Sequence, residues 1–166
     1  MFIFIRGLPG SGKTTISNKL AEQLHWDVIH VDHYKTEFIS QNQDAYITKE
    51  FIPYSHKKTL EKLSDIKNNV IIEELFWNND FIQALLSFCK KNNIQYQWFK
   101  LIRDKKTLLS IKRKIRNTFK DFETMEKQID DIKIKDEIII NNQNTDETIK
   151  QILTFIDKVT ETKNGN

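Results

Sequence analysis

A glycine-rich segment near the start of the chain, GLPGSGKTT at residues 7–15, constrains the fold more than any other stretch. It follows a continuous apolar run at residues 2–5, which is typical of a strand buried on both faces of a sheet. From Lys13 to Leu24, apolar residues recur at steps of three and four, which predicts an amphipathic helix. The segment therefore predicts a buried strand, a tight loop and a helix in direct succession.

The segment matches the pattern G-x-x-x-x-G-K-[ST], in which glycines let consecutive backbone N–H groups wrap around a phosphate. The N-terminus of the following helix also favours an anion. In such a loop Lys13 would reach the β- and γ-phosphates of a nucleoside triphosphate, and the Thr14 hydroxyl would bind Mg²⁺. A tight glycine turn with an exposed lysine is the alternative. The residues expected to contact the nucleotide are Gly7, Pro9, Gly10, Ser11, Gly12, Lys13, Thr14 and Thr15.

Strand and helix patterns alternate along the rest of the chain. Further strands are expected at residues 26–32, 69–74, 94–102 and 136–141, and helices at residues 56–69, 80–91 and 105–116. A last helix is expected after Asn144, because Glu147 three residues on is typical of a helix cap. This alternation predicts an α/β fold, a three-layer sandwich in which helices cover both faces of a five-stranded parallel sheet. No proline- or glycine-rich linker divides residues 1–166, so we expect one domain.

Composition argues against several other classes of protein. The single cysteine, Cys89, excludes an intrachain disulfide, and its apolar neighbours favour a packed core thiol over a nucleophile. The formal net charge of +3 is too small to indicate nucleic-acid binding by itself. No Cys/His spacing typical of a metal site occurs, and no window approaches the ~18 apolar residues of a membrane span. A cytoplasmic location is the default expectation.

Four features in order carry a family resemblance: GLPGSGKTT, HVDHYK at the end of the second expected strand, NVIIEE, and a basic helix after the fourth strand. The chain resembles the AAA-domain-containing small P-loop kinases, such as the 5′-kinase domain of polynucleotide kinase, gluconate kinase, chloramphenicol phosphotransferase and the zeta-toxin kinases. This resemblance implies a nucleoside-monophosphate-kinase-like fold with an acceptor-binding cap at residues 36–58 and a helical lid at residues 104–135. It also implies ATP and Mg²⁺ as cofactors. The expected reaction moves the γ-phosphate to a hydroxyl of a small molecule or of a nucleic-acid 5′ end.

Asp32 is expected at the carboxyl end of the second strand, where open α/β sheets bind their ligands. In the kinases that this chain resembles, an aspartate here is the general base, because a nearby carboxylate can orient the acceptor hydroxyl and take its proton. The D-x-x-K of Asp32 and Lys35 is similar to the D-x-x-R of the polynucleotide kinase type. The alternative for Asp32 is a helix N-cap. The expected acceptor contacts are Asp32, Tyr34, Lys35 and Glu73.

Two carboxylates end the third expected strand. An acid at this position can hold Mg²⁺ through water, as in other phosphate-loop proteins. Neighbouring strand residues face opposite sides, so only one of Glu73 and Glu74 is expected to face the site, and we favour Glu73. Solvated charge at the end of a strand is the alternative.

The basic helix after the fourth strand contains Lys112, Arg113 and Arg116. The related kinases carry R-x-x-x-R in a lid that closes over ATP, and such arginines stabilise the charge on the phosphoryl group in transfer. Lys112 and Arg116 share a helix face, and Arg113 competes with Lys112 for the first position. We expect all three to contact the nucleotide and Arg116 to act in catalysis. A solvated cationic face is the alternative.

A non-kinase ATP- or GTP-binding regulatory protein, or a slow NTPase, is the rival function. Such a switch would be expected to carry a base-specificity motif such as N-K-x-D, which this sequence lacks. The acceptor, a choice between ATP and GTP, and the oligomeric state are all left open by the sequence.

Overall fold

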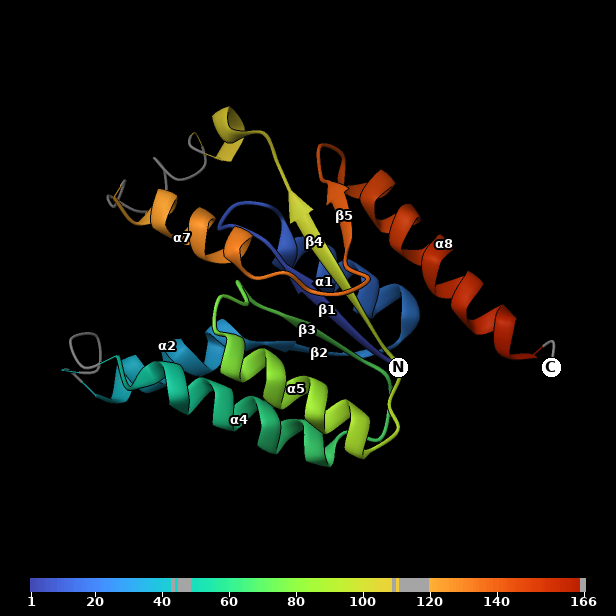
Figure 1. Cartoon of the computed structure of the whole chain (residues 1–166), viewed down its shortest axis with the longest axis horizontal. Helices are drawn as coiled ribbons and strands as arrows, with labels where there is room; N and C mark the ends of the chain where they lie inside the picture. Colours follow the sequence, from blue (N-terminus) through green and yellow to red (C-terminus); the bar gives the residue numbers. More distant parts are fainter. Residues whose placement is uncertain (43, 45–48, 109, 111–119, 165–166) are drawn as a thin grey trace.

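The computed structural model describes residues 1–42, 44, 49–108, 110 and 120–164. Five parallel strands form one sheet in the order β2-β3-β1-β4-β5, as Figure 1 shows, which confirms the predicted α/β fold. The strands are β1 (Phe2–Arg6), β2 (Asp27–His30), β3 (Val70–Glu73), β4 (Tyr96–Ile102) and β5 (Ile138–Asn141). The helices are α1 (Lys13–Leu24), α2 (Val31–Gln41), α4 (Phe51–Asp65), α5 (Asn79–Lys91), α7 (Lys120–Asp131) and α8 (Thr145–Asn164).

Helices cover both faces of this sheet, so the molecule has three layers (Figure 1). On one face, Phe4, Ile72 and Trp98 pack with the buried residues of α4 and α5. On the other face, Ile5 and Phe99 pack with the buried residues of α1 and α8. The central strand β1 is buried along its whole length, which explains why it reads as an uninterrupted apolar run before Arg6.

Because all five strands are parallel, their carboxyl ends meet at one edge of the sheet. The glycine-rich loop follows β1 at this edge and leads directly into α1. Asp32 follows β2, Glu74 follows β3, and Asn142 follows β5. The fold therefore gathers polar residues of three other segments around the glycine-rich loop.

The second strand is shorter than the sequence indicated, and the expectation that it extends to Asp32 is wrong. β2 ends at His30, whose partner across the ladder is Glu73, the last residue of β3. Beyond that pair no strand continues beside Val31, and α2 begins there with Val31 fully buried. Asp32 therefore lies in the first turn of α2, and the N-cap position belongs to His30.

The segment with weak periodicity, residues 35–54, is more helical than the sequence suggested. α2 runs to Gln41, and α4 begins at Phe51, five residues before the helix that the sequence predicted. Pro53 fits in the first turn of α4, where its missing N–H group leaves no helical hydrogen bond unmade. α2 and α4 pack against each other, which accounts for the apolar residues on both.

Other local expectations are confirmed. The Asn144 side chain caps α8 by accepting hydrogen bonds from the backbone N–H groups of Asp146 (2.9 Å) and Glu147 (3.2 Å). Cys89 is fully buried in the core under α5. Within the described part of the chain, none of the helices combines the length and the apolar character that crossing a membrane needs.

Candidate active site

The glycine-rich loop of residues 7–14 is a tight turn whose shape depends on glycine. A Cβ atom at Gly7 would lie 2.4 Å from the Leu101 carbonyl oxygen, so β4 approaches too closely for any other residue. Gly12 has φ +95°, and it is the N-cap of α1. Among the described residues, no side chain caps α1, which leaves its first N–H groups available to an anion. The loop is therefore suited to hold a phosphate chain.

Lys13 lies folded against this loop and donates a hydrogen bond to the Leu8 carbonyl oxygen (3.3 Å). Burial lowers the pKa of Lys13, while the carboxylates of Glu73, Asp32 and Glu74 act in the opposite direction. Carboxylates at the end of β3 and on α2 thus favour the charged form of Lys13. Bound phosphates would add negative charge beside Lys13 and favour its charged form.

Thr14 and Glu73 form a pair of oxygen donors beside the loop. The Thr14 hydroxyl donates to Glu73 Oε1 (3.0 Å), and the same carboxylate oxygen lies 2.9 Å from His30 Nδ1. The other ring nitrogen of His30 lies 2.8 Å from Asn18 Oδ1, on α1. Mg²⁺ prefers oxygen ligands, and it is commonly held by a hydroxyl or carboxylate together with water and substrate phosphates. The donor set of Thr14 and Glu73 fits that ion, and His30 holds Glu73 in place.

Asp32 lies in the first turn of α2. Its side chain is 67% exposed and therefore accessible to a second substrate. Lys35 Nζ bridges Asp32 Oδ1 (2.8 Å) and Glu74 Oε1 (2.6 Å). Glu74 itself is 1% exposed, so this carboxylate is a buried support for Lys35.

The charges of this bridge are mutually stabilised. Burial acts to lower the pKa of Lys35, but the carboxylates of Glu74 and Asp32 outweigh it and raise that pKa above the ordinary value. Burial acts to raise the pKa of Glu74, but His56 and Lys35 beside it leave that pKa below its ordinary value. Each of the two neighbouring carboxylates contacts a residue of the site: Glu73 accepts from Thr14, and Glu74 pairs with Lys35.

The remaining residues expected at the site are described next, with their neighbours in the structure. Tyr34 is half-buried and packs against the core beneath α2, and burial raises the pKa of its hydroxyl. The rings of His33 and His30 are 4.9 Å apart. Thr15 is exposed in the first turn of α1. The expected lid residues Lys112, Arg113 and Arg116 lie outside the described residues.

Sequence reasoning missed Arg6, the last residue of β1, because it read only as the end of an apolar run. Its guanidinium makes a two-pronged ion pair with Glu137, with Nη2 2.7 Å from Oε2. It also donates to the carbonyl oxygens of Ile129 and Ile132, each at 3.0 Å. Arg6 therefore ties the end of α7 to the strand that leads into the phosphate loop.

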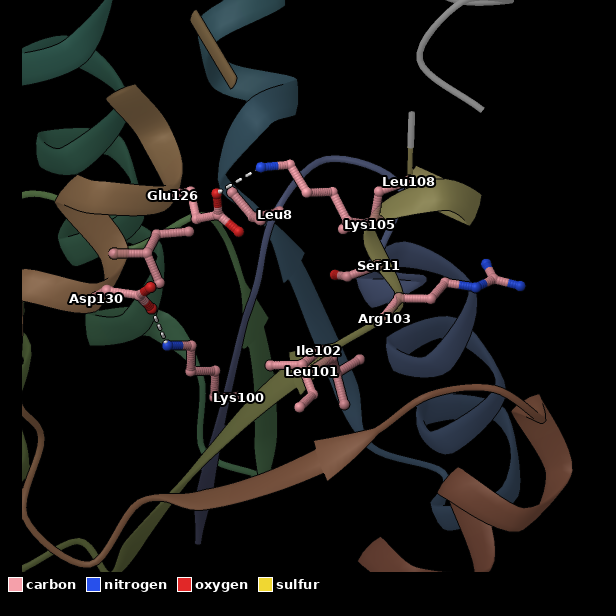
Figure 2. A pocket seen from close by; sticks show the side chains of 11 residues that line it. Leu8, Ser11, Lys100, Leu101, Ile102, Arg103, Lys105, Leu108, Glu126 and Asp130 are labelled. Carbon is pink, nitrogen blue, oxygen red and sulfur yellow. Dashed lines mark hydrogen bonds and ion pairs between the residues drawn. The ribbon is translucent and has the colours of Figure 1, made fainter. Parts of the chain in front are cut away.

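A cavity of about 120 Å³ lies between the phosphate loop, the end of β4 and α7 (Figure 2). Its polar rim includes two ion pairs that link β4 and the segment after it to α7: Lys100 with Asp130 (2.6 Å) and Lys105 with Glu126 (3.8 Å). Arg103 also lines the cavity, and its Nη1 is 3.5 Å from the Gly10 carbonyl oxygen (Figure 2). The cavity is smaller than the roughly 300–1,000 Å³ of typical ligand pockets, so a nucleotide does not fit in it.

The phosphate loop, the parallel sheet and the carboxylates at its edge define the class of the molecule: a P-loop nucleotide-binding domain with the fold of small kinases. A family model described as an AAA domain, AAA_33, matches residues 2–135, and the chain belongs to this family. The resemblance that the sequence motifs indicated is therefore confirmed.

Individual proteins with similar sequences or structures are kinases by name. A uridine kinase from Limosilactobacillus reuteri (strain DSM 20016) is 31% identical over 77 residues, which are 43% of this chain and 35% of that protein. The chain thus aligns with about a third of the length of this relative. Shikimate kinase from Aquifex aeolicus vf5 has a TM-score of 0.63 at 20% identity, covering 96% of this chain and 98% of that chain. A gluconokinase from Sinorhizobium meliloti 1021 has a TM-score of 0.66 at 14% identity, covering 96% and 93%. These two likenesses show the fold.

Proposed function

We propose that the protein is an ATP-dependent phosphotransferase that moves the γ-phosphate of ATP to an acceptor hydroxyl, with Asp32 as general base. One observation carries the proposal. Thr14 of the loop donates a hydrogen bond to Glu73 at the end of β3. The next residue, Glu74, is linked through Lys35 to Asp32, so the loop and the accessible carboxylate of α2 lie around the same end of β3.

The two sides of the site have different chemical tasks. The phosphate loop, Lys13 and Thr14 would bind the triphosphate, and Thr14 and Glu73 would hold Mg²⁺, which neutralises phosphate charge when bound. Asp32 would accept the proton of the acceptor hydroxyl as the new oxygen–phosphorus bond forms and the bond to the leaving ADP breaks. The products are ADP and the phosphorylated acceptor. Arg116, with Lys112 or Arg113, would support the charge on the phosphoryl group in transfer.

The bridge from Asp32 to Glu74 supports this role. Lys35 holds Asp32 Oδ1 at 2.8 Å, and because Glu74 holds Lys35 from beneath, the carboxylate of Asp32 is oriented while most of its surface stays accessible. Segment 36–58, which contains most of α2 and the start of α4, would then form the acceptor side. The acceptor itself is a small molecule or a nucleic-acid 5′ end.

The names of the similar proteins also support a kinase. By their names, these proteins are kinases of uridine, of shikimate and of gluconate. Their acceptors differ from one another, so they favour the reaction class and leave the acceptor of this chain open.

Acceptor-dependent turnover tests the proposal. ADP release from ATP and Mg²⁺ is measured alone and with a panel of nucleosides, sugars, aminoglycosides and 5′-hydroxyl oligonucleotides. A kinase releases ADP faster with one acceptor and labels that acceptor with the γ-phosphate, and Lys13→Ala abolishes both signals. ADP release that no acceptor accelerates, with phosphate appearing only as the free ion, would instead identify a slow NTPase.

A further inference from the structure

Asn142, which follows β5, is buried beside the phosphate loop, in a segment (residues 140–147) whose sequence resembles the loop that borders the adenine in the related kinases but does not single out a residue. Its side chain is 3% exposed, and both ends of its amide are used. Nδ2 donates to the Ser11 carbonyl oxygen (2.7 Å), and Oδ1 accepts from the Thr148 hydroxyl (3.0 Å). Since a carbonyl can only accept, the amide nitrogen must face Ser11, and the orientation of the side chain is fixed.

The backbone of Asn142 is fixed as well. Its N–H group donates to the Ile102 carbonyl oxygen at the end of β4 (2.8 Å). Thr148, which holds the other end of the amide, belongs to α8 and is itself buried. The amide therefore projects from a rigid junction of β4, β5 and α8 onto the phosphate loop.

The hydrogen bond to Ser11 also determines where the next N–H group points. In a trans peptide the C=O and N–H bonds point in opposite directions. No cis peptide bond occurs among the described residues. Because Asn142 holds the Ser11 carbonyl toward β5, the Gly12 N–H is turned away from β5. This N–H group belongs to the N-cap of α1, at the helix end that favours an anion.

The same contact explains why residue 12 is glycine. A Cβ atom at Gly12 would lie 2.3 Å from Asn142 Nδ2, which no side chain can tolerate without displacing the amide. The positive φ of +95° also favours glycine at this position. The loop conformation and the position of Asn142 are thus matched to each other.

We propose that Asn142 is a positioning residue for nucleotide binding: it orients the Ser11–Gly12 peptide so that the Gly12 N–H faces the bound phosphates. This inference rests on the phosphate loop binding a nucleotide, as in the proposed function, but it holds whatever the acceptor is. Asn142 acts through the loop, and it need not touch the nucleotide itself.

Binding of ADP and of tripolyphosphate, measured by calorimetry, tests the proposal. Tripolyphosphate has no base or sugar, so it reports the phosphate cradle alone. Asn142→Ala removes the donor to Ser11 and frees the peptide to rotate. Loss of one oriented hydrogen bond to a charged group predicts a weakening of about tenfold or more for both ligands. Asn142→Ser, a second neutral variant that cannot reach the same carbonyl, predicts the same result if Asn142→Ala folds poorly.

Asn78→Ala provides the matched control. Asn78 is also an asparagine whose side chain makes a structural hydrogen bond, to the backbone N–H of Phe81 at the start of α5 (2.9 Å). This variant should unfold at a lower temperature while both dissociation constants stay within about twofold of the wild type. All measurements are made well below the melting temperature of each variant, so stability alone cannot mimic the effect.

Three outcomes would overturn the proposal. Asn142→Ala and Asn142→Ser with wild-type affinity for tripolyphosphate would show that the loop holds its shape without the amide. Weaker binding of ADP with unchanged binding of tripolyphosphate would show that Asn142 acts on the base or sugar. If the wild type binds neither ligand, the proposed function fails together with this inference, whereas the first two outcomes leave the proposed function intact.

Discussion

Removal of one partner of the Arg6–Glu137 ion pair should be one of the most destabilising single substitutions in the described part of the protein. The two side chains are 2% and 8% exposed, so removal of either leaves an unpaired charge away from water. Arg6→Met replaces the arginine with an unbranched apolar side chain and leaves Glu137 without its ion-pair partner. It also leaves the carbonyl oxygens of Ile129 and Ile132 without their donor. Breaking a buried pair from one side typically costs about 3–5 kcal/mol.

Equilibrium unfolding in urea measures this cost. For a chain of this length, about 3–5 kcal/mol corresponds to a fall in melting temperature of roughly 6–20 °C. The exposed pair Lys19–Asp146 supplies the control, because Lys19→Met should cost less than about 1 kcal/mol. The double variant Arg6→Met/Glu137→Gln should cost less than the sum of the two single variants by about 1–3 kcal/mol.

Two results would refute this reasoning. A cost for Arg6→Met no larger than for Lys19→Met would mean that Arg6 does not hold α7 onto β1. Strict additivity in the double variant would mean that the two side chains do not interact, whatever each costs alone.

Three further predictions concern other groups. Glu74→Gln should destabilise the protein by about 2–4 kcal/mol near neutral pH, because it leaves the Lys35 charge without its buried partner. The pKa of Glu74 is held below its ordinary value of 4.5. The wild type should therefore be more stable than the variant above pH 4.5, and this difference in unfolding free energy should fade as the pH falls through the lower folded pKa. A difference that persists in urea titrations near pH 2 would contradict this. Burial raises the pKa of Cys89 to about 12, so a thiol reagent should label the native protein only as fast as it unfolds, and rapid labelling would contradict the burial. Glu73→Gln should raise the Mg²⁺ concentration needed for half-maximal ATP binding or turnover by about tenfold, and an unchanged requirement would exclude Glu73 from the metal site.

Much of the fold could be predicted because its signals are local. Each of these signals lies within or next to the element that it specifies. Examples are the apolar run before Arg6, the spacing of the loop glycines, and the apolar residues at steps of three and four from Lys13 to Leu24. The boundary between β2 and α2 could not be predicted in the same way. β2 ends at His30 because β3 ends opposite it at Glu73, and that register depends on a strand 43 residues away.

The residues of the candidate site also differ in whether a local sequence signal marks them. The role of Asp32 stays a prediction, whereas Lys13 and Thr14 could be placed in the glycine-rich loop from the sequence, because the spacing of that motif has a chemical reason. Arg6 and Asn142 could not, since each makes its decisive contact with a residue 131 positions away. A buried arginine at the end of an apolar strand, or an asparagine after a strand, has no local signal that distinguishes it from an exposed residue.

The central claim is that Asp32 serves as the base in phosphoryl transfer, and one measurement tests it most directly. Asp32→Asn is compared with the wild type for transfer of labelled γ-phosphate to the acceptor found in the panel, and for the dissociation constant of ATP. Asp27→Asn, an exposed aspartate at the start of β2, is the control and should transfer at the wild-type rate.

The account predicts that Asp32→Asn lowers transfer by about 10²–10⁴-fold, the usual contribution of a general base. ATP binding should be unchanged or slightly tighter, because a negative charge near Lys13 is removed. Full transfer by Asp32→Asn would contradict the account, and so would a loss of transfer fully explained by a loss of ATP binding.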